Sequence, residues 1–512
     1  MSKENIKTTS RTAFAIKNII FNFGYQLINT IANIVLPPLI IGRFGSATNG
    51  LISTIKQIIN YIQLVGAGIS ESTVVSLYKP LSDKNKEKIS SIYNAVGKTF
   101  NRAGGIFSII SVLVAFIYPL FISKELPYFF IVQIVLILSI SGLSEFLVIG
   151  KYRTLLIADQ KMYMVNLAQI VGAVVSTALT VFMIQASYNI VWVQLAASFA
   201  YVCRIFILHL YIRKNYKYLD KTSKPDYSAV SKRKAATIHQ VAGLIIFGSQ
   251  TLFIANFCGL TEASVYSVYN LIFTGLNTVL ATVSSAMLAG MGNLIATDNP
   301  EKVRKVYGIY ELAYYFLTFT IYITALIMIK PFIGLYTRGI TDAEYIRSEL
   351  IILFSCMGLL NCLRTPGATM INAKGHYDET KNRALIEMII CLIGQAALVW
   401  KFGIVGVLLG TICAYLYRTV DVIIYSNKKV LEQSVSCTLR RILCYALVLI
   451  VVGILIFQIN ITTNNYLQWI VYSAIVAIAI IIMLLIVTLL FDRKTLISGL
   501  YYAKDILRRQ ED

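Results

Sequence analysis

Charge is scarce in this sequence. Asp, Glu, Lys and Arg together make up 14% of its 512 residues, whereas hydrophobic residues make up 57% and the mean hydropathy is +0.69. Soluble globular proteins contain about 25% charged residues, so this composition excludes an ordinary soluble domain. The apolar runs are about 20 to 28 residues long, enough for a helix to cross a bilayer core of roughly 30 Å. They do not alternate polar with apolar residues as membrane β-barrels do. We therefore expect an all-α integral membrane protein.

Histidine is rarer still, and cysteine pairs are missing. The three histidines fall in separate segments without the spacing of metal ligands. The eight cysteines lie in or beside apolar segments and never form a C-x-x-C pair, so we expect them to be small buried apolar residues. The sequence also lacks a P-loop, a nucleophile elbow, an H-E-x-x-H motif and paired carboxylates on an outer loop. We expect neither an enzyme nor a cofactor.

Apolar segments long enough to span the membrane are present in about fourteen places. They lie near residues 14–42, 49–78, 104–123, 127–150, 163–185, 188–212, 238–259, 262–292, 306–330, 346–372, 380–400, 402–427, 441–460 and 465–491. The polar N-terminal residues lead into the first span without a small-residue cleavage site, so we expect no removable signal peptide.

Positive charge is concentrated in alternate loops. The formal net charge is +21, and 36 of the 46 Lys and Arg residues lie in the N-terminus, every second loop and the C-terminal tail. The opposite loops contain six of them, and four lie within spans. This asymmetry follows the positive-inside rule and predicts a multi-pass plasma-membrane protein with both termini cytoplasmic. A nucleic-acid-binding protein would need a soluble basic face, which this pattern does not provide.

The two halves of the chain resemble each other. The segment NKEKISSIY (85–93) matches NPEKVRKVY (299–307) at an offset of 214 residues. The same offset pairs AYVCR (200–204) with AYLYR (414–418). We therefore predict two parallel six-helix repeats that form two lobes, with two further helices appended. Parallel repeats of this kind are a known transporter design.

The repeat sets the expected domain organisation. We predict an N-terminal six-helix lobe, a basic cytoplasmic linker, a C-terminal six-helix lobe, the two appended helices and a cytoplasmic amphipathic tail, at residues 1–212, 213–237, 238–428, 429–491 and 492–512. The basic tail is expected to lie along anionic lipids of the inner leaflet.

Polar side chains form stripes along several spans. They recur at helical spacing in the first, second and eighth spans, at Asn22, Gln26, Asn29 and Asn33, at Lys56, Asn60 and Gln63, and at Asn270 and Asn277. One interpretation is amide hydrogen bonds between helices, which contribute about 0.6 kcal/mol each. The other is a hydrated cavity between the lobes. A lysine within a span favours the cavity, because burying its charge in lipid costs about 2.5 kcal/mol or more. Lys56 also lies close enough to the outer helix end to snorkel to the headgroups.

The other charges within spans leave alternatives open. Arg364 precedes Pro366-Gly367, a predicted break, and is a candidate anion-binding residue. Arg418 is spaced to pair with Asp421, and Arg204 is placed to snorkel. Four carboxylates are candidates for carrying a coupling proton or cation: Glu71, Glu145, Glu387 and Asp421. Glu145 and Glu387 are equally placed to pair with basic residues near the inner surface.

Four segments carry a resemblance to a known family: LPPLIIGRFGSATNGLISTI (36–55), LLIADQKMYMVNLAQIV (155–171), MINAKGHYDETKNRALIEMI (370–389) and KFGIVGVLLGTICAYLYRTV (401–420). They resemble bacterial polysaccharide flippases, the Wzx-type exporters of the MOP superfamily. The resemblance implies alternating-access transport of undecaprenyl-pyrophosphate-linked oligosaccharide repeat units to the outer leaflet, for surface polysaccharide biosynthesis. It also implies a cationic cavity for the pyrophosphate, with Lys56 and Arg364 at matching positions, and other polysaccharide-assembly proteins as partners.

The sequence differs from the lipid II flippases of the MOP superfamily, which it resembles. Helices one, seven and eight offer amides, His239 and tyrosines in place of a ring of arginines, which favours a surface-polysaccharide repeat unit over lipid II. Two other functions remain open. A drug or cation antiporter of the same superfamily would need a more acidic cavity, and a membrane-embedded polysaccharide polymerase would need a large charged outer loop.

Overall fold

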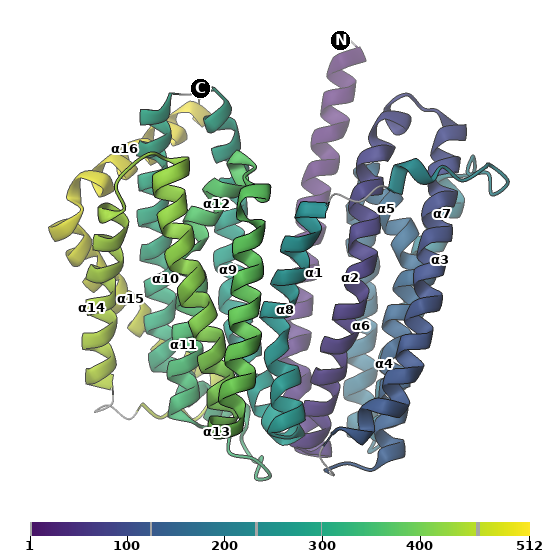
Figure 1. The fold of residues 1–512 in the computed structure, drawn as a ribbon, viewed down its shortest axis with the longest axis horizontal. Coiled ribbons are helices and arrows are strands. Elements are labelled where there is room, and N and C mark those ends of the chain that lie inside the picture. The colour runs from purple at the N-terminus through teal and green to yellow at the C-terminus, as the bar shows by residue number, and fades with distance from the viewer. Residues whose placement is uncertain (1–2, 123–124, 231–233, 298, 457–460, 512) are drawn as a thin grey trace. The chain divides into compact units, whose positions relative to one another are not determined.

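The computed structural model describes residues 3–122, 125–230, 234–297, 299–456 and 461–511 (Figure 1). Every regular element in these ranges is helical. Eleven of the helices found there are long and apolar enough to cross a membrane. This confirms an all-helical, multi-pass membrane protein.

The count of fourteen spans differs from these eleven in three places. Helix α2 (Ser46–Ser82) is not among the eleven, and the apolar part of α8, Val241–Phe257, is shorter than they are. Helix α13 (Tyr377–Tyr425) contains two of the predicted spans, which meet at the non-helical Gly403 (φ 55°, ψ −132°). The count of fourteen therefore stays a prediction.

The helices group into two units by their contacts, Met1–Ser267 (unit 1) and Val268–Asp512 (unit 2). The predicted domain boundaries stay a prediction beside this grouping. Unit 1 contains α1 (Lys3–Phe44), α2, α3 (Lys86–Ile117), α4 (Tyr128–Ser144), α5 (Gly150–Ala158), α6 (Met162–Gln185), α7 (Ile190–Asn215) and α8 (Lys234–Phe257). Within it, α6 packs between α1 and α7, while α2 packs against α3, α4, α5 and α8.

Two glycines let α2 lie close to its neighbours in unit 1. A Cβ added at Gly50 would lie 1.8 Å from the carbonyl oxygen of Leu260. A Cβ added at Gly248 on α8 would lie 1.8 Å from Nε2 of Gln57. Gly50 therefore lets α2 approach the backbone at the start of α9, and Gly248 leaves room on α8 for the side chain of Gln57 from α2.

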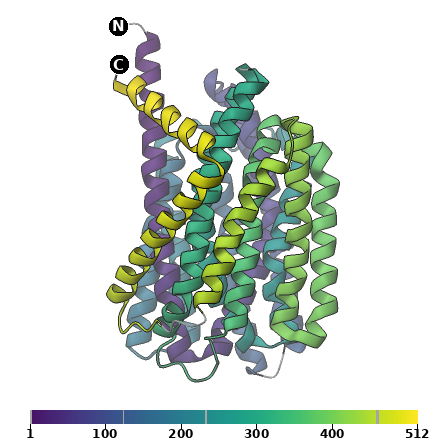
Figure 2. The same ribbon diagram turned by 90° about the vertical axis from the view of Figure 1, so that its left-hand side faces the viewer.

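Unit 2 contains most of α9 (Leu260–Thr297) and the rest of the chain. Its other helices are α10 (Pro300–Tyr336), α11 (Ser348–Leu363), α12 (Thr365–Lys374), α13, α14 (Ser436–Ile456), α15 (Tyr466–Phe491) and α16 (Arg493–Glu511). Helix α10 packs against α11, α14, α15 and α16. Figure 2 shows the sharp turn between α15 and α16, the two helices drawn in yellow.

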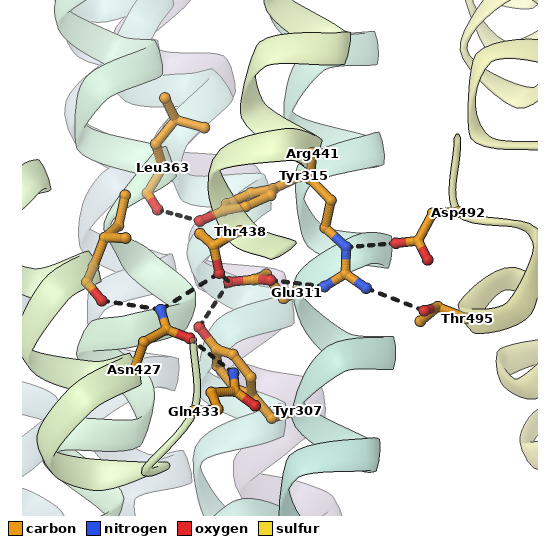
Figure 3. Close-up of polar contacts among 11 residues, drawn as sticks. Tyr307, Glu311, Tyr315, Leu363, Asn427, Gln433, Thr438, Arg441, Asp492 and Thr495 are labelled. Atoms are coloured by element: carbon orange, nitrogen blue, oxygen red, sulfur yellow. Dashed lines mark hydrogen bonds and ion pairs between the residues drawn. The ribbon is translucent and has the colours of Figure 1, made fainter. Parts of the chain in front are cut away.

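A buried ion network fastens α14 and α16 to α10 (Figure 3). The guanidinium of Arg441 is 4% exposed and donates from Nη1 to Glu311 Oε2 at 2.7 Å and from Nε to Asp492 Oδ2 at 2.6 Å. Its Nη2 donates to Thr495 Oγ1 at 3.2 Å. Thr438 and Tyr307 donate to the remaining oxygen of Glu311 at 2.8 and 2.9 Å. All the charged groups of this network have partners.

Several helix ends correct the sequence analysis. The break predicted before Pro366 is confirmed, because α11 ends at Leu363 and α12 begins at Thr365. The predicted span at 127–150 ends before the helix that contains it, because helix continues to Ala158 through the π-helix η2 (Glu145–Ile149) and α5. Hydropathy marks only the apolar part of a helix, so its polar end was assigned to a loop. Three cysteines expected to be buried, at positions 356, 413 and 437, are exposed on the protein surface.

Helix starts keep the 214-residue offset. Helices α2 and α9 begin at 46 and 260, and α3 and α10 begin at 86 and 300. The caps are alike: Asn85 and Asn299 each accept a hydrogen bond from the backbone N–H three residues ahead at 2.9 Å. Gly45 and Gly259 both have positive φ, at 84° and 101°. The repeat arrangement of the two lobes as a whole stays a prediction.

Candidate functional site

A polar cavity of about 850 Å³ lies within unit 1. It is lined from α1, α2, α4, η2, α5, α6, α7 and α8, by Tyr25, Asn29, Asn33, Lys56, Gln57, Ile59, Asn60, Gln63, Ser141, Glu145, Arg153, Gln169, Tyr201, Arg204, Leu244 and Phe247. Most of these side chains carry charges, amides or hydroxyls. We call it the unit 1 cavity.

The polar stripes of the first two spans meet here. Lys56, Asn60 and Gln63 enter from α2, and Asn29 and Asn33 enter from α1. Their spacing puts each set on one helix face, and the structure turns both faces toward the same space. The predicted stripe on α1 reaches further than the cavity, because Gln26 is exposed and does not line it.

Positive charge dominates the unit 1 cavity. Lys56 makes no ion pair with any described residue, so its ammonium group is available in the cavity. Arg204 lies over the ring of Tyr201, 5.6 Å from its centroid, and its buried Nε has no hydrogen-bond partner among the described residues. Arg204 therefore lines the cavity, and its snorkelling stays a prediction. The third cation, Arg153, pairs with Glu145 at 3.0 Å, as one alternative for Glu145 predicted.

Several lining residues were missed by the sequence analysis. Arg153 stood in a segment assigned to a loop, and Gln169 and Tyr201 are single polar residues in otherwise apolar helices. The 214-residue offset between the two halves gave one indication of two of these lining residues. Tyr201 and Arg204 belong to the AYVCR segment that marks the repeat.

The candidates in unit 2 are engaged with each other. Arg364 pairs with Glu387 and donates to Asn361 Oδ1 at 2.8 Å, and its guanidinium lies 4.9 Å from the ring centroid of Tyr415. The side chain of Arg418 contacts Asp421 at 2.6 Å, which confirms the predicted local pair.

This charged group in unit 2 extends further. Arg418 lies 3.5 Å from Glu387, and Arg383 also pairs with Asp421. The two coupling candidates Glu387 and Asp421 therefore each contact two arginines. Neither carboxylate is available to a cation without displacing one of them.

The remaining candidates fall into two groups. Asn277 accepts hydrogen bonds from Tyr322 at 2.9 Å and from Cys362 at 3.1 Å, so it joins helices within unit 2 as the helix-bonding interpretation expects. Asn270 is half-buried on α9. The side chains of Glu71 on α2 and His239 on α8 lie outside the described part of the chain.

The fold resembles that of solved membrane transporters. A lipid II flippase, MurJ in an inward closed conformation, is similar with a TM-score of 0.67 and 16% identity, over 93% of this chain and 100% of that one. A multidrug resistance MATE family transporter of the MOP superfamily is similar in its inward-facing conformation, with a TM-score of 0.56 and 15% identity, over 78% of this chain and 93% of that one. An outward-facing conformation of a multidrug resistance MATE family transporter is similar with a TM-score of 0.56 and 13% identity, over 81% of this chain and 94% of that one. No protein-family model and no curated protein sequence matches the chain.

Proposed function

We propose that the protein is a flippase for undecaprenyl-pyrophosphate-linked oligosaccharide repeat units, which it moves from the inner to the outer leaflet of the plasma membrane for surface polysaccharide biosynthesis. The observation that carries this proposal is the unit 1 cavity, where Lys56 and Arg204 lack carboxylate partners among the described residues and amides surround them. Alternating access between two lobes fits the fold class, whose members include lipid II flippases.

The chemistry of the cavity suits both parts of such a headgroup. Ammonium and guanidinium groups bind phosphate oxygens through charge-assisted hydrogen bonds, and guanidinium does so in a fork. Charge interactions are stronger here than in bulk water, because the surrounding protein and lipid lower the effective dielectric constant. The amides of Asn29, Asn60 and Gln169 offer donors and acceptors that match sugar hydroxyls.

A second candidate function is export of organic cations, since the similar structures include multidrug transporters. This function requires an accessible carboxylate. Glu145 in the unit 1 cavity contacts Arg153, and Glu387 and Asp421 in unit 2 contact arginines. The excess of positive charge in the cavity repels cations, so we favour the flippase.

The partners follow from the same proposal. The tail helix α16 contains Arg493, Lys494 and Lys504, and exposes Leu500 and Tyr501. A basic amphipathic helix of this kind binds anionic lipids of the cytoplasmic leaflet. Arg364 remains a candidate to contact the pyrophosphate if Glu387 releases it. Other polysaccharide-assembly proteins would supply the lipid-linked units and receive them.

Lys56 is the residue on which the proposal is tested. Lys56→Gln should abolish glycan export, whereas Lys56→Arg should retain part of it, because the positive charge matters more than the shape. The measurement is surface glycan at matched protein abundance in cells that lack the native gene. Lys401→Gln, at an exposed lysine on α13, is the matched control and should export normally. Normal export by Lys56→Gln would remove Lys56 from the site.

A further inference from the structure

We propose that Glu145 is a built-in counter-anion of the unit 1 cavity. The Glu145 carboxylate pairs with the guanidinium of Arg153. A multiply charged pyrophosphate group displaces this carboxylate and binds Arg153, while the singly charged phosphodiester of a membrane phospholipid does not. The inference rests on the proposed function and explains how such a cavity would avoid filling with the phospholipids around it.

The contact between Glu145 and Arg153 is suited to exchange. Arg153 Nη2 lies 3.0 Å from Glu145 Oε1, but this oxygen accepts no well-directed hydrogen bond from any described residue. The pair is therefore held by charge without the directed hydrogen bonds of the strongest ion pairs. The Arg153 side chain is 27% exposed and both residues line the cavity, so an incoming anion reaches the guanidinium directly.

The π-helix η2 brings the two residues together. Glu145 is its first residue, and Arg153 follows eight positions later on α5. In an unbroken α-helix, eight positions separate two side chains by about 80° around the axis. One extra residue in a π-turn reduces this angle to about 20°. The bulge thus places the carboxylate over its own arginine, and such bulges are frequent at functional sites.

The neighbours of Glu145 leave Arg153 as its main partner. Helix α3 presents the apolar rings of Phe100 and Phe107 to the bulge. Helix α7 presents Tyr201 and Arg204, whose guanidinium lies over the Tyr201 ring. Lys56 enters the same cavity from α2. Two cations thus remain for the ligand, and the third is masked.

This arrangement separates ligands by charge. A tethered carboxylate competes at an effective concentration of about millimolar or more. A monoanion that replaces Glu145 exchanges one negative charge for another and gains little. A pyrophosphate carries further charge, so it holds Arg153 while also contacting Lys56 or Arg204. Discrimination then comes from the carboxylate as well as from the cations, as is usual for specific sites.

Binding to the purified full-length protein in detergent tests this inference, with inorganic pyrophosphate and dimethyl phosphate as probes. The native protein should bind pyrophosphate and bind dimethyl phosphate much more weakly. Glu145→Gln frees Arg153 and should tighten dimethyl phosphate binding by about tenfold, in the range of close charge pairs. Adding Arg153→Gln should remove this gain. Glu145→Asp shortens the side chain by one methylene, so its affinity for dimethyl phosphate should lie between those of the native protein and Glu145→Gln. This variant takes the place of Glu145→Gln if the glutamine variant does not fold.

The outcomes separate this inference from the proposed function. Pyrophosphate binding with unchanged weak binding of dimethyl phosphate in both Glu145 variants would overturn the counter-anion and leave the flippase standing. Tighter dimethyl phosphate binding that persists when Arg153→Gln is added to Glu145→Gln would also overturn the counter-anion. A native protein that binds no pyrophosphate would overturn the proposed function and the inference with it.

Discussion

Lys56 and Arg204 show that a charged residue within an apolar segment indicates a polar environment around it. A charge that faces lipid is costly, so a lysine without a carboxylate partner is expected to reach water, the headgroups or a ligand. The structure places Lys56 in a cavity of about 850 Å³, beside amides that repeat along the same helix face. The positive charge of Lys56, which costs free energy in lipid, makes the cavity suited to an anion.

One ion pair at the basic linker gives a prediction with a pH dependence. Lys88 donates to Asp226 at 2.7 Å and, with Ser228, lowers the pKa of that carboxyl from its ordinary 3.8 to about 2. The pair therefore stabilises the folded linker above pH 3.8 and is lost as pH falls through 2. Protection of the linker from hydrogen exchange, corrected for intrinsic rates, should be equal at pH 7 and 5.

A variant of the same pair provides the comparison. Asp226→Asn should raise hydrogen exchange of the linker at pH 7, because the amide cannot pair with the ammonium group of Lys88. Lys224→Gln, at an exposed lysine two residues before Asp226, is the control and should exchange like the native protein. Equal exchange in all three proteins would show that the pair does not hold the linker.

The sequence predicted some site residues and not others for physical reasons. Lys56, Asn60 and Asn29 were found because each lies in a stripe with regular helical spacing. Arg153 was missed because it lies beyond the predicted span at 127–150, in a polar continuation of the helix that hydropathy does not mark. The π-turn that turns Arg153 toward Glu145 also leaves no regular helical spacing between them. Arg364 was correctly placed at a helix break, but its pairing with Glu387 depends on how α11 and α13 pack, which no local pattern records.

At the scale of helices, the network around Arg441 fastens the C-terminal elements. Arg441→Met would leave Glu311, which is 1% exposed, with a buried and uncompensated charge. Breaking one side of a buried pair costs about 3–5 kcal/mol, so the melting temperature of the purified protein should fall clearly. Arg440→Met, at the exposed neighbouring arginine, should leave it unchanged.

The double variant separates charge from packing in this network. Glu311→Gln combined with Arg441→Met removes the buried negative charge together with its partner, so it should recover part of the lost stability. No recovery would mean that Arg441 stabilises α14 by packing alone. The sequence analysis did not find this network, because Glu311 is a single carboxylate in an apolar helix and its partner lies 130 residues away.

For the whole molecule, the distribution of basic residues predicts the topology. Single cysteines replacing Ser82, Ser223 or Ser434 in a cysteine-free background should resist an impermeant thiol reagent in intact cells, because all three lie in the basic loop set. The same cysteines should react in inside-out vesicles, which controls for accessibility. Labelling of two of the three from outside would reverse the assignment of cytoplasmic termini.

The fold could be predicted further than the site. Span lengths gave an all-helical membrane protein, and the 214-residue offset reappears in the starts of α2 and α9 and of α3 and α10. The count of spans does not follow from hydropathy alone, because polar residues lower the hydropathy of α2 and one residue, Gly403, separates two helical parts of α13. Local composition records how apolar a helix is, but not where packing bends it or which polar side chains share a cavity.

Transfer of a lipid-linked glycan by the purified protein tests the central claim most directly. The protein is reconstituted into liposomes that contain a fluorescent undecaprenyl-pyrophosphate oligosaccharide, and a membrane-impermeant quencher reports movement between leaflets. We expect faster transfer with the native protein than with Lys56→Gln, inhibition by pyrophosphate, and no inhibition by an excess of a lipophilic organic cation. Transfer no faster than in protein-free liposomes, together with transport of the organic cation, would contradict the account.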